Sequence, residues 1–414
     1  MNTSLNHPVF KHERIIALDV LRGFAILGIL VMNIQSFSMP GAAYLNPMAY
    51  GDMSGMNKWV WMLSHIFADQ KFMSIFSILF GAGVILFTDN AERRTGKSAV
   101  LHYRRTFWLL LIGLIHAHLI WFGDILVTYA LCGFLVYLFR RKKPMTLLLA
   151  GLIIVALHTV IYIYFGWSLS YWPEQSIFET KEAWKPSMEA INNEIAAYTG
   201  SFSQQQAIRS QSALMLEIFV FLTTFLWRAG GLMLVGMALY KWGVLSASKP
   251  KTFYQKGLAM SWTLGLPIIA FGIVDNFDNN WSMEFSMFFG GQYNYWGSLF
   301  ISFGYICAIM LWIKTSLFES FKIRLAAVGR MALTNYLMQS LICVFVFYGS
   351  GLGLFGQLNR GEQIGIVIAI WLVQLAWSKP WLEDFKFGPF EWLWRTLSYK
   401  KKQPVIMNLK TEEV

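Results

Sequence analysis

The sequence is short of charged residues. Only 14% of its 414 residues are Asp, Glu, Lys or Arg, against roughly a quarter in soluble globular domains. Hydrophobic residues make up 56% of the chain and aromatic residues 17%. A soluble fold would leave too much of this apolar surface in water, and disorder requires low hydrophobicity. The composition therefore excludes soluble and disordered proteins and leaves an integral membrane protein.

Cysteine and short motifs of known chemistry are also scarce. The three cysteines, Cys132, Cys307 and Cys343, lie inside apolar runs and have no metal-ligand spacing. The chain contains no GxxxxGK[ST], GxGxxG, CxxC or HExxH motif. No disulfide framework, metal site or tightly bound cofactor is therefore predicted.

Long apolar runs are what the sequence has instead. A helix needs roughly 20 apolar residues to cross the hydrocarbon core of a bilayer, about 30 Å thick. Ten segments meet or approach this length: 15–37, 67–88, 104–121, 124–140, 145–167, 214–240, 253–274, 295–318, 331–348 and 363–382. The sequence thus predicts an all-α polytopic integral membrane protein with about ten transmembrane helices.

The net charge of +11 reports orientation in the membrane. Of the 34 Lys and Arg residues, 26 fall in one alternating set of loops and tails and 5 in the other. Because Lys and Arg collect in cytoplasmic loops, both termini are predicted to lie inside the cell. This distribution accounts for the basic charge without a nucleic-acid partner, and none is predicted.

The predicted spans and loops divide the chain into four parts. Residues 1–140 form an N-terminal four-helix membrane part, and 141–213 hold the fifth span and a long outer loop. Residues 214–400 form a C-terminal five-helix membrane part, and 401–414 are a cytoplasmic tail. The outer loop 168–213 carries five acidic residues and two prolines. It is either a small folded cap or a solvated spacer.

Ionisable residues inside predicted spans are the candidate functional residues, because a bilayer makes them costly. In the first span, Asp19 and Arg22 are three residues apart and can pair. Arg22 and Asn33 are eleven residues apart, about three helical turns, and share a face. The three residues are either a structural ion pair with an Asn near the helix end, or a binding face in which Arg22 and Asn33 bind substrate.

The second span offers a histidine and a carboxylate. His65 and Asp69 are four residues apart and share a face if the short helix 56–66 continues into the span. A carboxylate can orient an imidazole for acid–base chemistry, so Asp69 is a candidate catalytic residue and His65 a candidate binding residue. Lys71 is two residues further and is expected to point elsewhere, either to snorkel or to meet another helix. It is a further binding candidate.

The third span ends in IHAHLIWFGD, residues 115–124. His116 and His118 lie on opposite sides of a helix, which disfavours a metal chelate. Asp124 opens the fourth span, either as a helix cap or as a carboxylate that turns back to orient His116. In the second case, His116 and Asp124 form the base and orienter of a catalytic dyad on the predicted outer side.

Two later spans supply the remaining candidate binding residues. Arg228 lies near mid-depth in the sixth span and predicts an internal anionic partner, either a carboxylate or a ligand phosphate. The ninth span places Asn335 and Gln339 on one face, with Arg330 at its cytoplasmic mouth. This polar pair either links helices or helps to bind substrate.

Five blocks of the sequence resemble the YeiB family of bacterial inner-membrane proteins. The function of the domain that defines this family is unknown. They run in the family's order over nearly the whole chain, and GPFEWLWR is the most specific. The resemblance implies a multi-pass protein of the bacterial inner membrane. The blocks are RIIALDVLRGFAILGILVMNIQSF (14–37), KFMSIFSILFGAGVILF (71–87), LLLIGLIHAHLIWFGDILVTYAL (109–131), GRMALTNYLMQSLIC (329–343) and GPFEWLWRTLSY (388–399).

The N-terminal part is also similar to transmembrane acyltransferases of the heparan-α-glucosaminide N-acetyltransferase type. Those enzymes carry an acyl group from cytoplasmic acyl-CoA to an acceptor across the membrane. Their ADLVFP block is loosely like residues 68–72 here, and they have a histidine about ten residues before its Asp. This chain has Trp59 at that place, so acyl transfer here would use a different base. Their first-span pattern LD..RG.A…N is matched here by Asp19, Arg22, Gly23, Ala25 and Asn33.

Two functions from different classes follow. The first is a membrane acyltransferase that moves an acyl group from cytoplasmic acyl-CoA, as co-substrate, to a lipid or cell-envelope glycan on the outer side. His116 would be its general base, Asn33 would bind the thioester carbonyl, and Arg22, Arg228 and Arg330 would hold the CoA phosphates. The second is a transporter or lipid-handling protein without catalysis. Membrane lipids are expected partners in both, and a homo-oligomer is left open.

Overall fold

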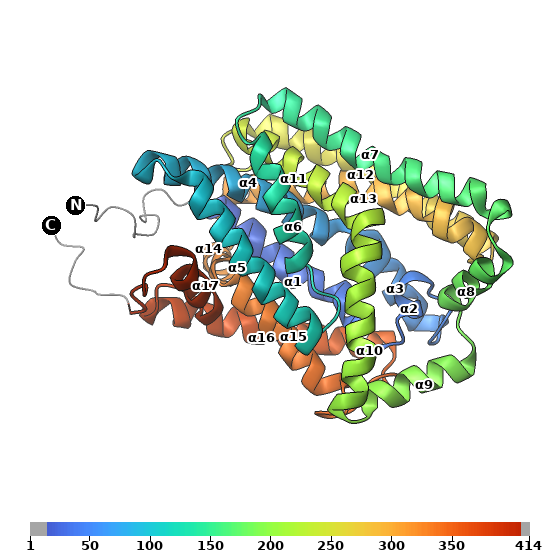
Figure 1. Ribbon diagram of the computed structural model, residues 1–414. Coiled ribbons are helices and arrows are strands. Elements are labelled where there is room, and N and C mark those ends of the chain that lie inside the picture. The colour runs from blue at the N-terminus through green and yellow to red at the C-terminus, as the bar shows by residue number, and fades with distance from the viewer. Residues whose placement is uncertain (1–14, 407–414) are drawn as a thin grey trace.

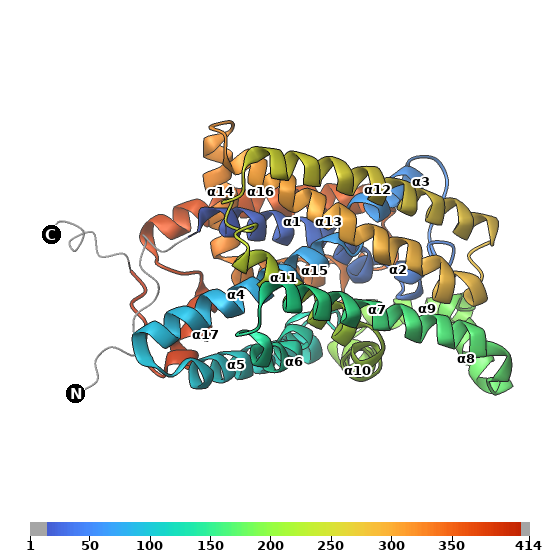
Figure 2. The same ribbon diagram turned by 90° about the horizontal axis from the view of Figure 1, so that it is seen from above.

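The computed structural model describes residues 15–406, and its regular elements are all helices. The long helices lie side by side in one bundle, with short helices at its two ends (Figures 1 and 2). The N-terminal half contains α1 (Ile16–Ser38), α2 (Ala42–Leu45), α3 (Gly55–Phe67), α4 (Lys71–Thr95), α5 (Ser98–Leu119), α6 (Leu126–Val136), η2 (Tyr137–Phe139), α7 (Pro144–Ser168), η3 (Leu169–Tyr171), α8 (Glu174–Trp184) and α9 (Met188–Thr199). The C-terminal half contains α10 (Phe202–Met215), η4 (Leu216–Phe225), α11 (Leu226–Lys241), α12 (Lys251–Asp278), η5 (Met283–Gly290), α13 (Gly291–Ile313), α14 (Glu319–Arg330), α15 (Ala332–Phe347), α16 (Arg360–Asp384) and α17 (Pro389–Tyr399).

Seven helical stretches are long and apolar enough to cross a membrane, and the bent pair α14–α15 makes an eighth if it counts as one span. All ten predicted spans fall on helices, but α5 and α6 do not meet this standard. Helix α5 has 22 residues and carries Arg104 and Arg105 in its first half. Helix α6 with η2 would be only about 21 Å long at 1.5 Å per residue. The protein is a polytopic all-α membrane protein with seven or eight such spans, fewer than the ten predicted.

Helices that are distant in sequence cross closely in the bundle. A Cβ atom on Gly23 of α1 would lie 2.0 Å from the carbonyl oxygen of Leu325 in α14, and one on Gly329 would lie 1.9 Å from the carbonyl oxygen of Asp19. Glycine at both contact points lets the two backbones touch. Helix α4 packs against α11 in the same interleaved way. The helices of the four predicted parts pack against one another, and the division of the chain into these parts stays a prediction.

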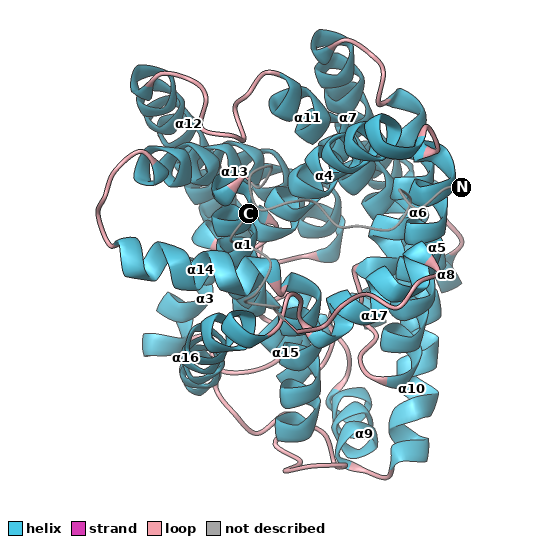
Figure 3. Ribbon diagram, turned by 90° about the vertical axis from the view of Figure 1, so that its left-hand side faces the viewer, coloured by secondary structure: helices cyan, strands magenta, loops and turns pink. Residues whose placement is uncertain are grey.

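The outer loop 168–213 is a folded cap rather than a solvated spacer. Its helices α8 and α9 lie at the end of the bundle opposite α17, and α9 lies beside α10 (Figures 1 and 3). The Trp184 indole donates a hydrogen bond to the carbonyl of Trp281 at 2.7 Å, and the carbonyl of Tyr198 accepts one from Gly349 N at 2.9 Å. Both aromatic side chains are buried. The cap is therefore held to the membrane bundle by packed and hydrogen-bonded contacts.

A carboxylate in α17 holds the bend between α14 and α15, which meet at 80°. Glu391 Oε1 accepts hydrogen bonds from the backbone N–H groups of Leu333 and Thr334 at 2.6 and 3.0 Å. Its Oε2 accepts one from Thr334 Oγ1 at 2.5 Å. A negative group satisfies the free N–H donors at a helix start. The GPFEWLWR block thus anchors α17 to the first turn of α15.

We expect Glu391→Ala to lower the thermal stability of the purified protein in detergent. The change leaves three donors without their acceptor, and each buried unsatisfied group costs about 1–3 kcal/mol. Thermal unfolding followed by tryptophan fluorescence measures the effect. Glu383→Ala, at an exposed position at the same end of the chain, is the control and should leave Tm unchanged. Equal Tm values for the two variants would show that the Glu391 contacts do not hold the bend.

The predicted orientation can be tested with single cysteines, because Cys132, Cys307 and Cys343 are fully buried. A membrane-impermeant maleimide should label Glu189→Cys in the cap of intact cells. It should label Lys401→Cys only after the inner membrane is permeabilised, since both positions are exposed and the positive-inside rule puts them on opposite sides. Labelling of Lys401→Cys in intact cells would reverse the predicted topology.

Candidate functional site

The stretch α3–α4 is broken near its middle. Gly55–Thr95 forms one apolar helical stretch of 41 residues, but α3 ends at Phe67 and α4 begins at Lys71. At the break, Asp69 N donates to Ser64 O at 2.9 Å, and Gln70 takes a left-handed conformation with φ of 65°. Backbone that leaves the helix inside a membrane is stable only where protein groups satisfy it.

Side chains supply the hydrogen bonds that the break removes. Lys71 Nζ donates to the carbonyl oxygen of His65 at 2.6 Å. The Tyr305 hydroxyl of α13 donates to the carbonyl oxygen of Phe67 at 2.9 Å. The interruption is therefore a built feature of the fold, closed by a buried lysine and a tyrosine.

The same lysine belongs to a chain of polar side chains. Lys71 Nζ donates to Asn294 Oδ1 at 2.6 Å, and Asn294 Nδ2 donates to Asp69 Oδ2 at 2.7 Å. His65 Nδ1 lies 3.1 Å from the same Asp69 oxygen, as predicted from their spacing. Lys71 thus meets another helix, one of the two predicted alternatives, but the position that it reaches was not predicted. The prediction assumed a continuous helix, whereas the left-handed turn at Gln70 brings the side chains of Asp69 and Lys71 to Asn294.

Arg228 of α11 lies next to this chain and has neutral partners. Its Nη2 atom donates to Ser74 Oγ at 2.8 Å and to Ser298 Oγ at 2.7 Å. Its Nη1 atom donates to the carbonyl oxygen of Tyr295 at 3.0 Å. No carboxylate of residues 15–406 is within 4 Å of its guanidinium nitrogens. Of the two predicted partners, a carboxylate is not in contact, and a ligand phosphate stays a prediction. Hydroxyl and carbonyl oxygens accept from two of its nitrogens, while its Nε is buried without a partner, and the residue is 2% exposed.

His116 and Asp124 form a buried pair at the α5–α6 turn. His116 Nδ1 and Asp124 Oδ2 are 2.7 Å apart, and both side chains are 1% exposed. Asp124 Oδ1 accepts a hydrogen bond from Val127 N at 2.8 Å at the start of α6. Asp124 therefore both caps the helix and contacts the histidine, the two alternatives that the sequence left open. The catalytic role of the pair stays a prediction.

The far nitrogen of His116 is not engaged by the pair. His116 Nε2 is buried and has no hydrogen-bond partner. The rings of Tyr336 and Trp121 lie 5.2 and 6.2 Å from the imidazole. A carboxylate at Nδ1 favours the tautomer whose Nε2 lone pair is free to accept a proton.

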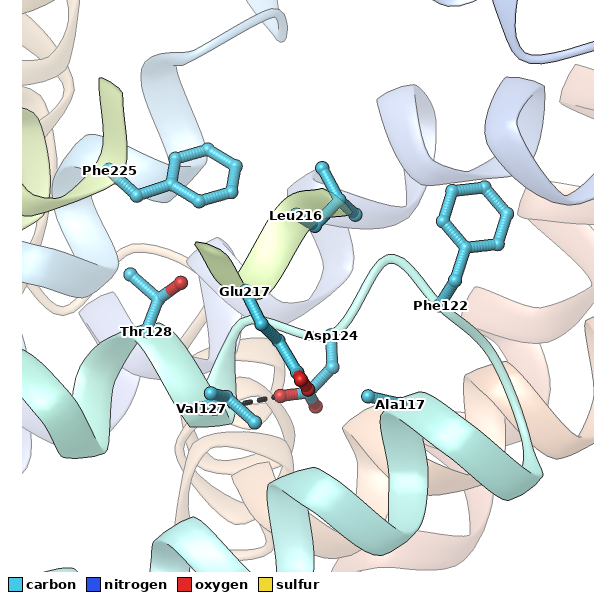
Figure 4. A pocket seen from close by; sticks show the side chains of 8 residues that line it. All are labelled: Ala117, Phe122, Asp124, Val127, Thr128, Leu216, Glu217 and Phe225. Atoms are coloured by element: carbon cyan, nitrogen blue, oxygen red, sulfur yellow. Dashed lines mark hydrogen bonds between the residues drawn. The ribbon is translucent and has the colours of Figure 1, made fainter. Parts of the chain in front are cut away.

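A small pocket lies beside the dyad, between α5, α6 and the π-helical segment η4 (Figure 4). Its cavity volume of about 10 Å³ leaves room for roughly one water-sized group, far less than a drug-sized site. Asp124 faces it, whereas His116 does not line it. Glu217 of η4 also faces the pocket, and its Oε2 atom lies 3.2 Å from His118 Nε2. The lining residues are Ala117, Phe122, Asp124, Val127, Thr128, Leu216, Glu217 and Phe225.

Asn335 links helices through its polar side-chain atoms. Its Nδ2 donates to Val328 O at 3.1 Å and to Ser378 Oγ at 3.2 Å, while its Oδ1 accepts a hydrogen bond from the Trp377 indole at 3.1 Å. Gln339 continues this role by donating to the carbonyl of Ile26. These contacts fit the interhelical interpretation. Substrate binding by Asn335 stays a prediction, with the side chain already occupied.

Three other predicted site residues make no hydrogen bond to His116 or Asp124 within residues 15–406. Arg22 donates to Asp19 Oδ1 at 2.9 Å, the structural ion pair that the sequence allowed. Arg330 is the last residue of α14, at the bend before α15. Asn33 is partly exposed on α1 and makes no hydrogen bond to the dyad. Their predicted roles in binding acyl-CoA remain predictions.

Several polar residues near the α3–α4 break and near the pocket beside His116 and Asp124 were not predicted from the sequence. Asn294 and Ser298 are four residues apart in α13, a weak signal because such polar residues are common near span ends. His158 of α7 is buried, with its ring 4.2 Å from Tyr162 and 4.1 Å from Tyr295. Thr128 lines the pocket without any sequence signal. Only the packing of separate helices brings these residues to the sites.

Known proteins match the chain over nearly its full length. It is 33% identical to the uncharacterized protein YeiB of Escherichia coli (strain K12) over 95% of this chain and 98% of the relative. It is also 33% identical to the uncharacterized protein YxaH of Bacillus subtilis (strain 168), over 97% and 98% of the two chains. No solved structure matches. Residues 239–401 match the family model described as protein of unknown function (DUF418). The chain therefore belongs to the YeiB family of DUF418 proteins.

Proposed function

We propose that this protein is a membrane acyltransferase with His116 as its general base and Asp124 as the residue that positions it. The observation that carries the proposal is the 2.7 Å contact at Nδ1, combined with a buried Nε2 that has no partner. Base–orienter pairs of this kind activate weak nucleophiles in acyl transfer. The similarity of the first span to transmembrane acyltransferases supports the same reaction class.

In the proposed reaction, cytoplasmic acyl-CoA is the donor and a lipid or envelope glycan on the outer side is the acceptor. His116 Nε2 takes the proton of an acceptor hydroxyl or amine while that O or N atom attacks the thioester carbonyl carbon. The tetrahedral adduct collapses with cleavage of the C–S bond, and the imidazolium returns its proton to the leaving thiolate. Asp124 stabilises the imidazolium, and the dyad ends the cycle unchanged.

Access to the base requires movement in this proposal. His116 is 1% exposed and the neighbouring pocket reaches Asp124 first. Tyr336 and Trp121 flank the imidazole, so a shift of either side chain would open a path to Nε2. Movements of this kind on substrate binding are common in enzymes that exclude water.

We expect His116→Ala to reduce acyl transfer by about 10²–10⁴-fold, the usual contribution of a general base. Asp124→Asn should cause a smaller loss, because the amide oxygen can still cap α6 but the negative charge is gone. Mass spectrometry of envelope lipids and glycans measures the product in a strain without its own copy of the gene, complemented with each variant.

His102→Gln is the matched control, since His102 is a second buried histidine of α5 that contacts Gly133 O rather than the dyad. It should keep the wild-type acylation pattern at equal protein level. Identical lipid and glycan profiles in the uncomplemented strain and in the wild-type complement would rule out the acyltransferase.

A second candidate function is transport without catalysis, and the broken stretch α3–α4 favours it. Arg228, beside the break, donates to the carbonyl of Tyr295, and the Tyr295 hydroxyl donates to Val155 O at 2.8 Å. Val155 is close to the middle of α7. Interrupted helices with buried charges near mid-membrane are typical of ion and substrate sites in transporters.

If this second candidate is correct, Asp69→Asn and Lys71→Met should abolish proton flux into proteoliposomes driven by a potassium diffusion potential. Each change removes a titratable member of the Lys71–Asn294–Asp69 chain. An entrapped pH-sensitive dye measures the flux, and His116→Ala should leave it unchanged. Wild-type flux equal to that of protein-free liposomes would exclude proton-coupled transport.

A further inference from the structure

The pocket beside the dyad has the lining of a site for a positively charged group. Two of its eight lining residues, Asp124 and Glu217, are carboxylates, and none is basic. Phe122 and Phe225 supply aromatic side chains at opposite sides of the pocket (Figure 4). Carboxylates attract cations directly, and the faces of aromatic rings attract them through the ring quadrupole.

Two oxygen acceptors at the pocket have no donor. Glu217 Oε2 contacts His118, but Glu217 Oε1 is buried and unpartnered. Thr128 is 4% exposed, and its hydroxyl makes no hydrogen bond with residues 15–406. Figure 4 shows this hydroxyl turned toward the side of the pocket where Glu217 and Phe225 lie. Because a buried unsatisfied acceptor such as Glu217 Oε1 is costly, the pocket has a place for a group that donates hydrogen bonds.

A primary ammonium group fits these features better than a metal ion. It carries three N–H donors, which match the Glu217, Thr128 and Asp124 oxygens. A calcium ion takes about 6–8 oxygen ligands, more than this partly aromatic lining offers. The cavity volume of about 10 Å³ admits a water-sized terminal group such as an ammonium nitrogen and excludes a sugar ring.

The surroundings of the pocket indicate that its ligand comes from the membrane. Leu216, Glu217 and Phe225 belong to η4, whose other side carries Ile218, Phe219 and Leu222 at 59%, 58% and 55% exposed. In a membrane protein these large apolar side chains face lipid. The pocket therefore lies directly behind a lipid-facing wall.

We propose that this pocket binds the primary ammonium headgroup of a membrane lipid. Binding is argued from the pocket alone, and only the further role of that lipid as acyl acceptor rests on the proposed function. Glu217 Oε1 and Thr128 Oγ1 accept hydrogen bonds from the ammonium group, and Asp124 connects the site to His116.

The test is thermal stabilisation of the purified full-length protein in detergent, without any acyl donor. A ligand that binds only the folded protein raises Tm in a saturable way. Short-chain phosphatidylethanolamine should do so. Short-chain phosphatidylcholine should not, because its quaternary ammonium has no N–H donor. Equal shifts from both lipids would overturn the proposal.

Two variants test the acceptors without removing other contacts. Glu217→Gln keeps an oxygen for His118 and removes the charge, and should weaken phosphatidylethanolamine binding by about tenfold or more. Thr128→Val removes only an unpaired hydroxyl, so it should fold normally and bind severalfold more weakly. Glu284→Gln, an exposed carboxylate paired with Lys181, is the matched control and should bind as wild type. Unchanged binding by Glu217→Gln would overturn the site.

Soluble amines distinguish a membrane lipid from a free amine as the ligand. Ethanolamine and glucosamine should give no shift at concentrations where phosphatidylethanolamine saturates, and an equal shift from either would overturn the assignment to lipid. The acyl-transfer measurement is independent. Lipid binding without any acylated product would leave this site in place and reject the proposed function, whereas acyl transfer that persists without lipid binding would do the reverse.

Discussion

The structure depends on satisfying polar groups where no water is available. The interruption between α3 and α4 shows the constraint most directly, because it frees backbone carbonyls inside a stretch that the membrane surrounds. Lys71 and Tyr305 donate to two of these carbonyls; Tyr305 belongs to α13, and Lys71 also donates to Asn294 of α13. The packing of α13 against α4 is therefore a condition for the break, and the break in turn sets the positions of Asp69 and Lys71.

The polar residues divide into two groups by what their hydrogen bonds achieve. Asn335 and Arg228 have their side-chain donors largely engaged by other helices, and they hold the bundle together. His116 and Glu217 make a single side-chain contact each and leave a second buried atom unpartnered, whereas Arg228 leaves its Nε unpartnered but donates through both other nitrogens. An unpartnered buried atom costs stability, so a fold retains it more readily where a ligand or a proton uses it. This contrast directs attention to the end of α5.

Sequence reasoning located the helices more securely than the contacts between them. The spans follow from length and hydropathy, and all ten fall on helices, although α6 is too short to cross alone. The pairs His65–Asp69 and His116–Asp124 were accessible because each lies within a few residues on one chain segment. Asn294, Thr128 and His158 were not, since their partners lie on helices far away in sequence. The link of Lys71 to Asp69 through Asn294 was not predicted either, because a left-handed residue at Gln70 cannot be read from the sequence.

The sequence by itself determined that this is an all-helical membrane protein, because 56% hydrophobic residues in long runs have no other stable arrangement. It also placed a carboxylate within reach of His116, since a turn of a few residues brings Asp124 back toward the end of α5. Only the tertiary structure decided that Arg228 has neutral partners and that Glu217 and Asp124 share a pocket. Those outcomes depend on which helices pack together, and buried apolar surface and hydrogen bonding between distant segments set that choice.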